Sequence, residues 1–324
     1  MPGVATFDFM DVGMGDCTFI TGPGDETILI DFGSTKNRRI GPRDAILYLR
    51  DQLAGRVPSL DYLFITHSDV DHYNQIKLLI KNIPHFTVDT VIYSGQVADY
   101  TKSRTSLAPL AAVTAKLLTY GNAYRRSLSQ TPDFNFTDMR AWVLSANYPR
   151  ANEGGDPNPK SIVLYFSYKG WGILCCGDAT EATEDSILYA NRRNLGLLEC
   201  EVLKVPHHGS ETSSSADWVA ATKPKALIVS ADANPIYKLP RSGVLESYFG
   251  TVEAGALRHS YVAYAPVVRA RKRAGAKGKM VDGEFREYTT LSRVFCTLSE
   301  FDQGAQYQVK IAANGNLTYS TTFV

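Results

Sequence analysis

The chain has 324 residues, of which 44% are hydrophobic, and its formal net charge at pH 7 is +1. This length and apolar content are enough for one large domain or two, and the near-neutral charge excludes a strong attraction of the whole chain to nucleic acid or a membrane surface. No uncharged apolar run is long enough to span a bilayer, and the N-terminus lacks the basic and apolar regions of a signal peptide. The five cysteines are an odd number without a C-x-x-C motif, so we expect buried, reduced thiols in a cytoplasmic protein.

Short apolar runs and turn residues predict the elements. In chain order, strands are predicted over residues 4–9, 17–21, 27–31, 62–66, 88–93, 140–144, 161–168, 172–176, 202–205 and 226–229. Helical patterns cover residues 44–53, from His72 to about 83, 108–128, 181–192 and 214–222. From about residue 262 onward, strand and loop are expected.

The order of these elements predicts an α/β fold. Strands come first as meanders and later alternate with helices, which is typical of two packed sheets with helices on their outer faces. We therefore expect a four-layer αββα sandwich, in a single domain over residues 1–324. A helical excursion from the sheet is expected near residues 101–130.

Four of the six histidines fall in two short motifs. In the first, His67, Asp69, Asp71 and His72 lie within six residues, directly after the apolar run 62–65. Imidazoles and carboxylates are the side chains that bind divalent Zn or Mn. Loops at strand ends are where open α/β folds place their chemistry.

Later parts of the chain add three candidates of the same kind. Asp178 follows Gly177 at the end of an apolar run, and His207 and His208 follow another such run. A single His-x-Asp match is commonly a false positive. Three motifs in order, each after a predicted strand, indicate a metal site assembled from separated loops.

These residues together resemble the metallo-β-lactamase superfamily, and within it the metallo-hydrolase domain of the ComEC-type competence proteins of DNA uptake. The resemblance rests on residues 11–16, 30–33, 66–72, 177–179 and 203–210, and on Asn158 with Ser161. It covers about residues 7 to 250, and the C-terminal part, 250–324, matches only loosely. It implies the metallo-β-lactamase fold, with two divalent metal ions (Zn or Mn) in the cleft between the sheets.

The resemblance also implies roles for the candidates. Asp178 is similar to the residue that bridges two metals, and His207 to a ligand from a later motif. His208 either binds metal or supports a ligand, and a turn would be needed to bring both adjacent histidines to one site. Carboxylate-rich sites favour Mn²⁺ more than a three-histidine site does. The implied metal ligands are His67, Asp69, Asp71, His72, Asp178, His207 and His208.

Three departures from the family pattern affect the site. Asp69 stands where the superfamily has a second histidine, a variation similar to that of the competence-type proteins. Asn74-Gln75 replaces a Gly-Gly pair, and Lys238-Leu239-Pro240 stands where a late His-Pro is expected. The missing histidine leaves open whether one metal or two binds, and whether Lys238 takes over its function.

Asp71 and Lys238 are the candidate catalytic residues. Bound metals would lower the pKa of a water from about 15.7 toward 7, and Asp71 could orient that water. Lys238 could contact phosphate or the leaving group, although many lysines are simply solvated. The resemblance implies that Asp31 supports the ligand loop through hydrogen bonds. Asp11 and Asp16 are expected to accept hydrogen bonds from backbone N–H groups of their own turns.

Substrate contacts are expected from Ser210 and from a basic segment. Ser210 stands before a predicted helix, and N–H groups at a helix start donate hydrogen bonds to phosphate. Arg271, Lys272 and Arg273 belong to a cluster of six cations in residues 269–279. Such a cluster either neutralises phosphates of a nucleic acid or forms a solvated loop.

The leading functional hypothesis is a metal-dependent hydrolase, a phosphodiesterase or nuclease that attacks DNA or RNA with a metal-activated water. It would act alone or as the partner of other proteins in a multi-component system. The alternatives are a hydrolase of a small phosphodiester or ester, and a degenerate, non-catalytic binding module, because a fold does not fix its substrate. Metal content distinguishes the binding module from the enzymes, and salt-dependent affinity for a polynucleotide distinguishes the two enzymes.

Overall fold

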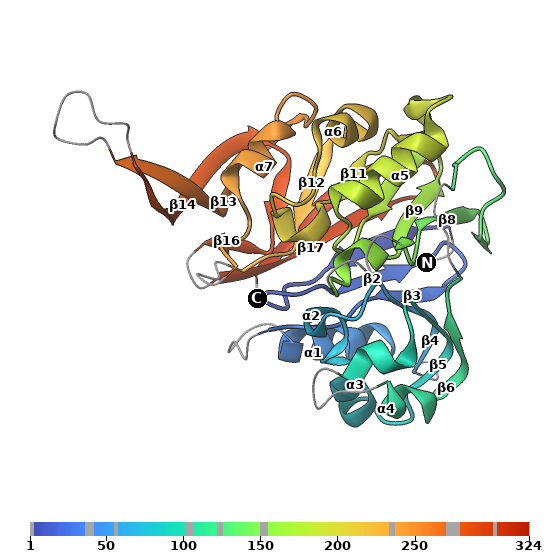
Figure 1. Cartoon of the computed structure of the whole chain (residues 1–324). Coiled ribbons are helices and arrows are strands. Elements are labelled where there is room, and N and C mark those ends of the chain that lie inside the picture. Colours follow the sequence, from blue (N-terminus) through green and yellow to red (C-terminus); the bar gives the residue numbers. More distant parts are fainter. Residues whose placement is uncertain are drawn as a thin grey trace, which may run out of the picture.

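A computed structural model describes residues 3–35, 42–54, 58–101, 107–121, 126–149, 155–232, 237–269, 279–300 and 303–323. Their strands form two large sheets and one separate pair (Figure 1). The first sheet has the order β16 (Leu298–Glu300), β17 (Gln303–Ile311), β1 (Ala5–Phe9), β2 (Thr18–Thr21), β3 (Thr27–Ile30), β4 (Ser59–Ile65), β5 (Thr87–Tyr93) and β6 (Thr114–Thr119), with β18 (Leu317–Phe323) also paired to β17.

The second sheet lies against the first and is built from the later part of the chain. Its order is β15 (Val294–Cys296), β12 (Ala226–Val229), β11 (Val202–Lys204), β10 (Trp171–Cys175), β9 (Val163–Tyr168), β8 (Met139–Ser145) and β7 (Phe134–Phe136). The separate antiparallel pair is β13 (Ala254–Arg269) with β14 (Lys279–Ser292), which projects from the body of the molecule (Figure 1).

Helices cover the outer face of each sheet (Figure 1). The first sheet carries α1 (Pro42–Gln52), α2 (Val70–Tyr73), α3 (Ile76–Asn82) and α4 (Ala108–Ala111), and the second carries α5 (Glu181–Asn191), α6 (Ala216–Thr222) and α7 (Ser242–Ser247). Short 3-10 helices are η1 (Val97–Thr101), η3 (Asn158–Lys160), η4 (Leu195–Leu198) and η5 (Pro206–Gly209). The predicted αββα sandwich is confirmed. Among the described helices, none has both the length and the apolar character needed to cross a membrane.

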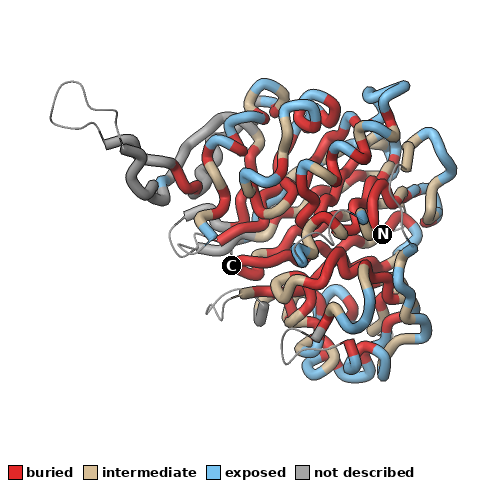
Figure 2. The backbone as a smooth tube through the Cα atoms, in the orientation of Figure 1, coloured by how far each residue is buried: buried red, intermediate tan, exposed pale blue. Residues whose placement is uncertain are grey.

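Three apolar clusters hold the four layers together. One lies between the sheets and includes Phe7 and Phe166, and the other two lie between each sheet and its own helices. Neighbouring residues of a central strand alternate between clusters, because side chains alternate across a sheet. Cys175 belongs to the inter-sheet cluster and Cys176 to the cluster under the helices. Both faces of the central strands are therefore buried (Figure 2), and all five cysteines are free and buried, as predicted.

The helix predicted over residues 108–128 is wrong for most of its length. After the single turn of α4 the chain forms β6, which pairs in parallel with β5. Apolar periodicity predicts helices poorly where an open sheet edge offers partners for the backbone N–H and C=O groups. The threonines of β6 also favour a strand. Instead of leaving the sheet, this part of the chain extends it.

The last strands complete both sheets. β15 lies in parallel beside β12 in the second sheet, and β17 lies antiparallel to β1 in the first. The C-terminal residues that matched only loosely in sequence, 294–300 and 303–323, are thus part of the same sandwich.

The candidate site lies where parallel strands end. β3 and β4 are parallel neighbours in the first sheet, and β10, β11 and β12 are parallel neighbours in the second. The loops that follow these strands carry the sequence motifs described above. The carboxyl ends of neighbouring parallel strands meet at one edge of a sheet, so motifs far apart in sequence meet there.

Two glycines allow the loops of the first sheet to pack backbone against backbone. A Cβ atom on Gly33 would lie far inside van der Waals contact with the main chain of Asp71, and one on Gly15 (φ +153°) would clash with the carbonyl of Gly33. In this packing, Asp16 N–H donates to the Asp71 carbonyl at 3.2 Å, and Gly33 N–H donates to the Asp16 carbonyl at 3.1 Å. The glycines thus hold the Asp71 loop in place.

We predict that Gly33→Ala destabilises the protein by roughly 1–3 kcal/mol or more, because the added methyl group meets backbone that cannot move cheaply. The control is Gly243→Ala, because a Cβ atom there meets nothing within 4 Å and Gly243 lies inside α7. That control should be neutral or stabilising by up to about 1 kcal/mol. Urea unfolding checks both, and equal midpoints for the two variants would contradict the packing argument.

A buried carboxylate in the first sheet gives a pH-dependent prediction. Asp8 on β1 lies opposite Gln308 on β17, whose Nε2 donates to Asp8 Oδ1 at 2.7 Å. Burial raises the pKa of Asp8 from 3.8 to about 6, although hydrogen bonds, the largest from Gln308, oppose the shift. Because the folded pKa is the higher one, stability is greatest below 3.8 and is lost as the pH rises toward and through 6.

Asp8→Asn keeps the acceptor for Gln308 and removes the charge. Relative to the wild type, its free energy of unfolding should therefore increase by about 1–3 kcal/mol between pH 4 and pH 7. Asp51→Asn, whose side chain is 66% exposed, is the control. Urea unfolding at several pH values measures the difference, and parallel pH profiles for wild type and Asp8→Asn would contradict the prediction.

Candidate metal centre

The loop after β4 brings two buried histidines together. The rings of His67 and His72 are fully buried, with centroids 4.1 Å apart. His72 Nε2 lies 3.3 Å from Asp178 Oδ2, and His67 Nε2 lies 3.9 Å from the same oxygen. His67 Nε2 is also 3.8 Å from Asp69 Oδ2. The loop of the first sheet thus meets Asp178, which follows β10 in the second.

The two adjacent histidines of η5 both turn toward this point. His207 and His208 have left-handed backbone conformations, with φ of 48° and 52°. His208 Nε2 lies 3.3 Å from Asp178 Oδ2 and 3.6 Å from Asp71 Oδ2, and His207 Nε2 lies 3.9 Å from Asp178 Oδ2. The consecutive positive φ angles turn the chain sharply enough for both rings to enter the same site.

Asp178 is therefore the centre of the cluster. The Nε2 atoms of all four histidines lie 3.3–3.9 Å from its Oδ2 atom. The ligand atoms of Asp71, His72 and His208 lie within 4.8 Å of one another, and so do those of His67, His72 and Asp178. A cavity of about 340 Å³ opens onto the cluster and is lined by Met14, Thr35, Asp69, Val70, Asp71, Asn158, Asp178, His207, His208, Tyr237 and Leu239.

A neighbour orients each imidazole ring through its second nitrogen. The partners of Nδ1 are Asp31 Oδ2 at 2.8 Å for His72, the Ser230 carbonyl at 2.7 Å for His208, Thr212 Oγ1 at 2.7 Å for His207 and Thr66 Oγ1 at 3.1 Å for His67. Carboxylate, carbonyl and hydroxyl partners of this kind orient metal-binding histidines. With Nδ1 occupied, each ring presents Nε2 to the site.

Asp31 anchors the ligand loop at three points. Its carboxylate accepts hydrogen bonds from Thr66 N–H at 2.7 Å, from Thr66 Oγ1 at 2.7 Å and from His72 Nδ1 at 2.8 Å. The residue is fully buried and has a positive φ of 58°. The geometry matches the supporting role that the family resemblance implies for this residue.

The side chains of the cluster fit a divalent cation. His67 Nε2, His72 Nε2, His208 Nε2 and Asp178 Oδ1 are buried and have no hydrogen-bond partner among the described residues. Buried polar atoms are normally paired, since each unpaired one costs about 1–3 kcal/mol. A cation bound between these atoms would satisfy them together. Imidazole nitrogen and carboxylate oxygen are the donors that Zn²⁺ and Mn²⁺ accept.

The protonation of the cluster follows from its carboxylates. Burial alone would lower the pKa of His72 and of His208, but Asp178 together with the neighbouring carboxylates outweighs it, and both pKa values are raised. Burial would likewise raise the pKa of Asp178, yet His208 and His72 hold it well below the usual range. Burial keeps the pKa of His67 low. A cation that binds here would replace the protons on the imidazoles.

A buried ion pair lies behind the imidazoles. Asp16 Oδ2 pairs with Lys204 Nζ, and its two oxygens lie 3.7 Å from His72 Nδ1 and 3.8 Å from His208 Nδ1. For Asp11 the predicted turn contact is confirmed, since its Oδ1 accepts from Gly13 N–H at 2.8 Å. For Asp16 the same prediction is wrong. The overlooked signal was a lysine inside the apolar strand β11, which requires a buried partner.

The structure does not bring Ser210 or Lys238 to the cavity wall. Ser210 Oγ accepts from Thr212 Oγ1 at 3.0 Å and so supports the partner of His207. Lys238 Nζ lies 5.3 Å from the ring of Tyr264, while the residues on either side of it line the cavity. Arg271, Lys272 and Arg273 lie outside the described residues.

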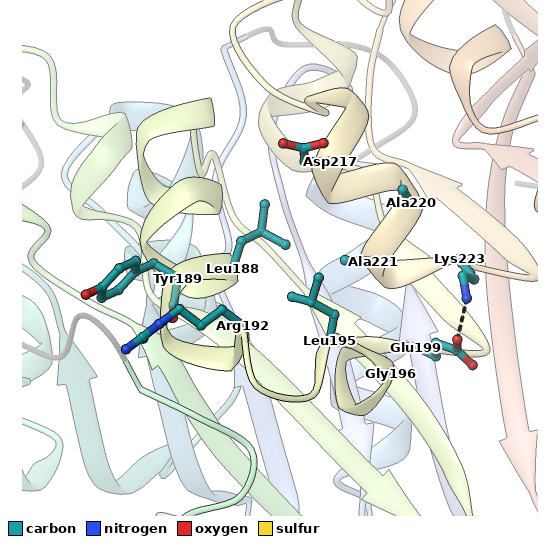
Figure 3. Close-up of a pocket in the computed structure, with 10 residues that line it drawn as sticks. All are labelled: Leu188, Tyr189, Arg192, Leu195, Gly196, Glu199, Asp217, Ala220, Ala221 and Lys223. Carbon is teal, nitrogen blue, oxygen red and sulfur yellow. Dashed lines mark hydrogen bonds and ion pairs between the residues drawn. The ribbon is translucent and has the colours of Figure 1, made fainter.

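A second cavity, of about 590 Å³, lies on the outer helical face of the second sheet, between α5, η4 and α6 (Figure 3). Its walls are largely apolar, with Leu188 and Leu195 between the helices, and Lys223 Nζ pairs with Glu199 Oε1 at 2.7 Å on its rim. None of its lining residues is a histidine. Of these two cavities, only the smaller one, over Asp178, is lined by histidines.

Comparison with known proteins agrees with this geometry. The family model described as "Metallo-beta-lactamase superfamily" matches residues 10–85. "ComE operon protein 3" of Bacillus subtilis is 27% identical over 252 residues, covering 74% of this chain and 30% of that protein. "Recombination protein 2" of Haemophilus influenzae is 27% identical over 240 residues, 74% of this chain and 26% of that protein. "Competence protein ComA" of Neisseria gonorrhoeae is 29% identical over 191 residues, 59% of this chain and 23% of that protein.

This chain thus spans less than a third of the length of these relatives. Among solved structures, the metallo-beta-lactamase fold protein YhfI of Bacillus subtilis is 12% identical with a TM-score of 0.44, over 77% of this chain and 94% of that one. The family model covers the loops that carry Asp16, Asp31 and the His67–His72 motif. The match of residues 10–85, the αββα sandwich and the similarity to competence proteins together show that the chain resembles the metallo-β-lactamase superfamily.

Proposed function

We propose that this protein is a metal-dependent hydrolase that cleaves phosphodiester bonds of DNA or RNA. The observation that carries the proposal is the convergence of four imidazole Nε2 atoms on the single carboxylate of Asp178, beside an open cavity. An apolar core would stabilise the fold better than this cluster does, because unpaired buried polar atoms are costly. A purely structural role therefore does not explain the cluster.

The charge of the site supports two divalent cations. Five carboxylates lie in or directly behind the cluster, those of Asp16, Asp31, Asp69, Asp71 and Asp178, and Lys204 pairs with Asp16. With neutral imidazoles, four negative charges remain, which two divalent cations would balance. The abundance of carboxylate oxygen favours Mn²⁺ alongside Zn²⁺.

Bound cations would lower the pKa of a coordinated water and counter the charge that develops on a phosphodiester. The protein side chains would then position the reactants. Asp71 lines the cavity, and its partly exposed carboxylate can orient the attacking water and accept its proton. Lys238, between the cavity-lining residues Tyr237 and Leu239, remains our candidate for contact with phosphate or the leaving group.

Two observations support a nucleic acid as the substrate. The relatives are named for competence and for recombination, which are processes that handle DNA. The chain also concentrates six cations in residues 269–279 although its net charge is only +1. Ser210, at the loop that follows η5, is proposed as a further phosphate contact.

One observation favours a second candidate, the hydrolysis of a small phosphodiester or ester. The cavity measures about 340 Å³, which is near the lower end of the range for small-molecule sites. A polynucleotide would have to present its scissile phosphate to this cavity and bind elsewhere through its backbone. The two candidates therefore differ in whether the chain binds a polymer outside the cavity.

We predict that Asp71→Ala and Asp178→Ala each reduce Mn²⁺-supported phosphodiester hydrolysis by about 100-fold or more, because each removes a hard ligand as well as a charge that holds the cations. Asp217→Ala, an exposed position on α6, is the control. Hydrolysis of a chromogenic phosphodiester and bound metal are measured on the same preparations. Undiminished activity in either variant would contradict the mechanism, and a wild type that binds no metal would favour a binding module.

We also predict that replacing Arg271, Lys272 and Arg273 together by Ala weakens the salt dependence of binding to duplex DNA. Each phosphate contact contributes about −0.9 to the slope of log affinity against log salt, so three lost contacts would flatten that slope by about 2.7. Hydrolysis of the small chromogenic diester should not change. A wild-type salt slope in the triple variant would favour the small-diester hydrolase.

A further inference from the structure

Asn158 is an uncharged residue in the wall of the cavity over Asp178, and it is not among the ligands that the family resemblance implies. It begins η3 and lines the cavity together with Asp69, Asp71, Asp178, His207 and His208. Its Nδ2 atom lies 3.4 Å from His207 Nε2. Its Oδ1 atom is buried and has no hydrogen-bond partner among the described residues. An amide that lies this close to His207 and leaves its buried oxygen unpaired calls for an explanation.

The segment that carries Asn158 is firmly attached to the site. Ser161 Oγ accepts from Asp178 N–H at 3.1 Å and lies 3.4 Å from His67 Nδ1. Ser161 N–H donates to the Asn158 carbonyl at 3.0 Å, and Ile162 N–H donates to the Thr66 carbonyl at 2.9 Å. The position of the Asn158 side chain is therefore set by the same loops that carry His67 and Asp178, as a ligand position requires.

The hydrogen bonds of His207 determine which atom faces Asn158. Thr212 Oγ1 donates its proton to Ser210 Oγ at 3.0 Å, so it accepts from His207 Nδ1 at 2.7 Å. His207 Nε2 then carries a lone pair, toward which the amide N–H of Asn158 points. A cation bound to that lone pair leaves nothing for the amide to donate to. Rotation of the amide by 180° exchanges its nearly isosteric N and O atoms and presents Oδ1 instead.

We infer that Asn158 contributes its amide oxygen as a neutral ligand to a cation bound at His207 and Asp178. This inference rests on the proposed metal-dependent function. The side-chain amide of Asn158 and His207 Nε2 are close enough, at 3.4 Å, for both residues to bind one cation. A neutral oxygen adds a hard donor without adding a sixth negative charge to the site.

The experiment compares two variants of Asn158 that separate a ligand from a hydrogen-bond donor. Asn158→Leu has similar volume and can neither ligate nor donate, whereas Asn158→Asp keeps an oxygen ligand but cannot donate to His207. Titration calorimetry with Mn²⁺ alone measures each binding step on the full chain. Visible absorption of the Co²⁺-loaded protein reports the ligand set. Asn135→Asp, at an exposed position of β7, controls for the added charge.

A ligand role predicts that Asn158→Leu weakens one Mn²⁺ by at least about tenfold and shifts the Co²⁺ spectrum. Asn158→Asp should bind that cation at least as tightly as the wild type, and Asn135→Asp should not differ from it. Urea midpoints of the chelator-treated variants should equal that of the wild type. If the wild type binds a single cation, the same comparison applies to that cation.

Two results would overturn the inference while leaving the proposed function intact. Wild-type Mn²⁺ affinity in Asn158→Leu would show that the amide does not touch the cation. Equal losses in Asn158→Leu and Asn158→Asp would show that Asn158 acts only as a donor to His207. A wild type that binds no Mn²⁺ would instead contradict the proposed function itself.

Discussion

The buried carboxylate of Asp178 is the group on which the site depends, because all four motif histidines meet at its Oδ2 atom. Such a group is costly to bury, and the fold offsets the cost locally. Asp178 N–H is held by Ser161 Oγ, and the imidazoles of His72 and His208 keep its pKa low. The remaining repulsion among carboxylates would be relieved by cations, for which these side chains provide suitable ligand atoms.

The site lies at the interface between the two sheets. The first sheet supplies Asp31 and the His67–His72 loop, and the second supplies Asp178 and the histidines of η5. The inter-sheet core fixes the distance between these halves, since packed interiors do not deform continuously. The pair of Asp16 with Lys204 crosses the same interface just behind the imidazoles, and Lys204 Nζ also lies 3.5 Å from the Gly177 carbonyl beside Asp178. A buried ion pair is weak evidence for stability but it fixes geometry well.

Two departures from the family pattern have physical explanations in the structure. Asn74, in place of a glycine, fastens the Asp31 loop to the end of α2: its Oδ1 accepts from Ser34 N–H at 3.0 Å, and its Nδ2 donates to the Ser34 carbonyl at 2.7 Å. Where the late histidine is missing, His208 offers another imidazole, whose Nε2 lies near Asp71, His72 and Asp178. The left-handed turn of η5 makes this possible, because it directs two consecutive histidines into one site.

The sequence was sufficient for features that are local and insufficient for those that depend on distant partners. Most strands and the helices at 42–52 and 181–191 follow from apolar periods and turn residues, and the motif loops follow strands whose ends meet. The strand β6 was missed because the edge of β5, not its own residues, decides its conformation. The partner of Asp16 lies 188 residues away on β11, and β15 and β17 find neighbours from the other parts of the chain.

The proposed separation of metal binding from polymer binding agrees with the same architecture. The candidate ligands come from short loops at strand ends, each tied to a sheet by backbone hydrogen bonds or by an oriented Nδ1 atom. In the sequence, the basic cluster runs from the end of β13 at Arg269 to the start of β14 at Lys279. This strand pair belongs to neither of the two large sheets. Changes in that pair need not disturb the loops that carry the candidate ligands. Under the proposed function, a site held by the two sheets and polymer contacts on a separate element would let the substrate range change while the chemistry stays fixed, as expected where one fold serves many substrates.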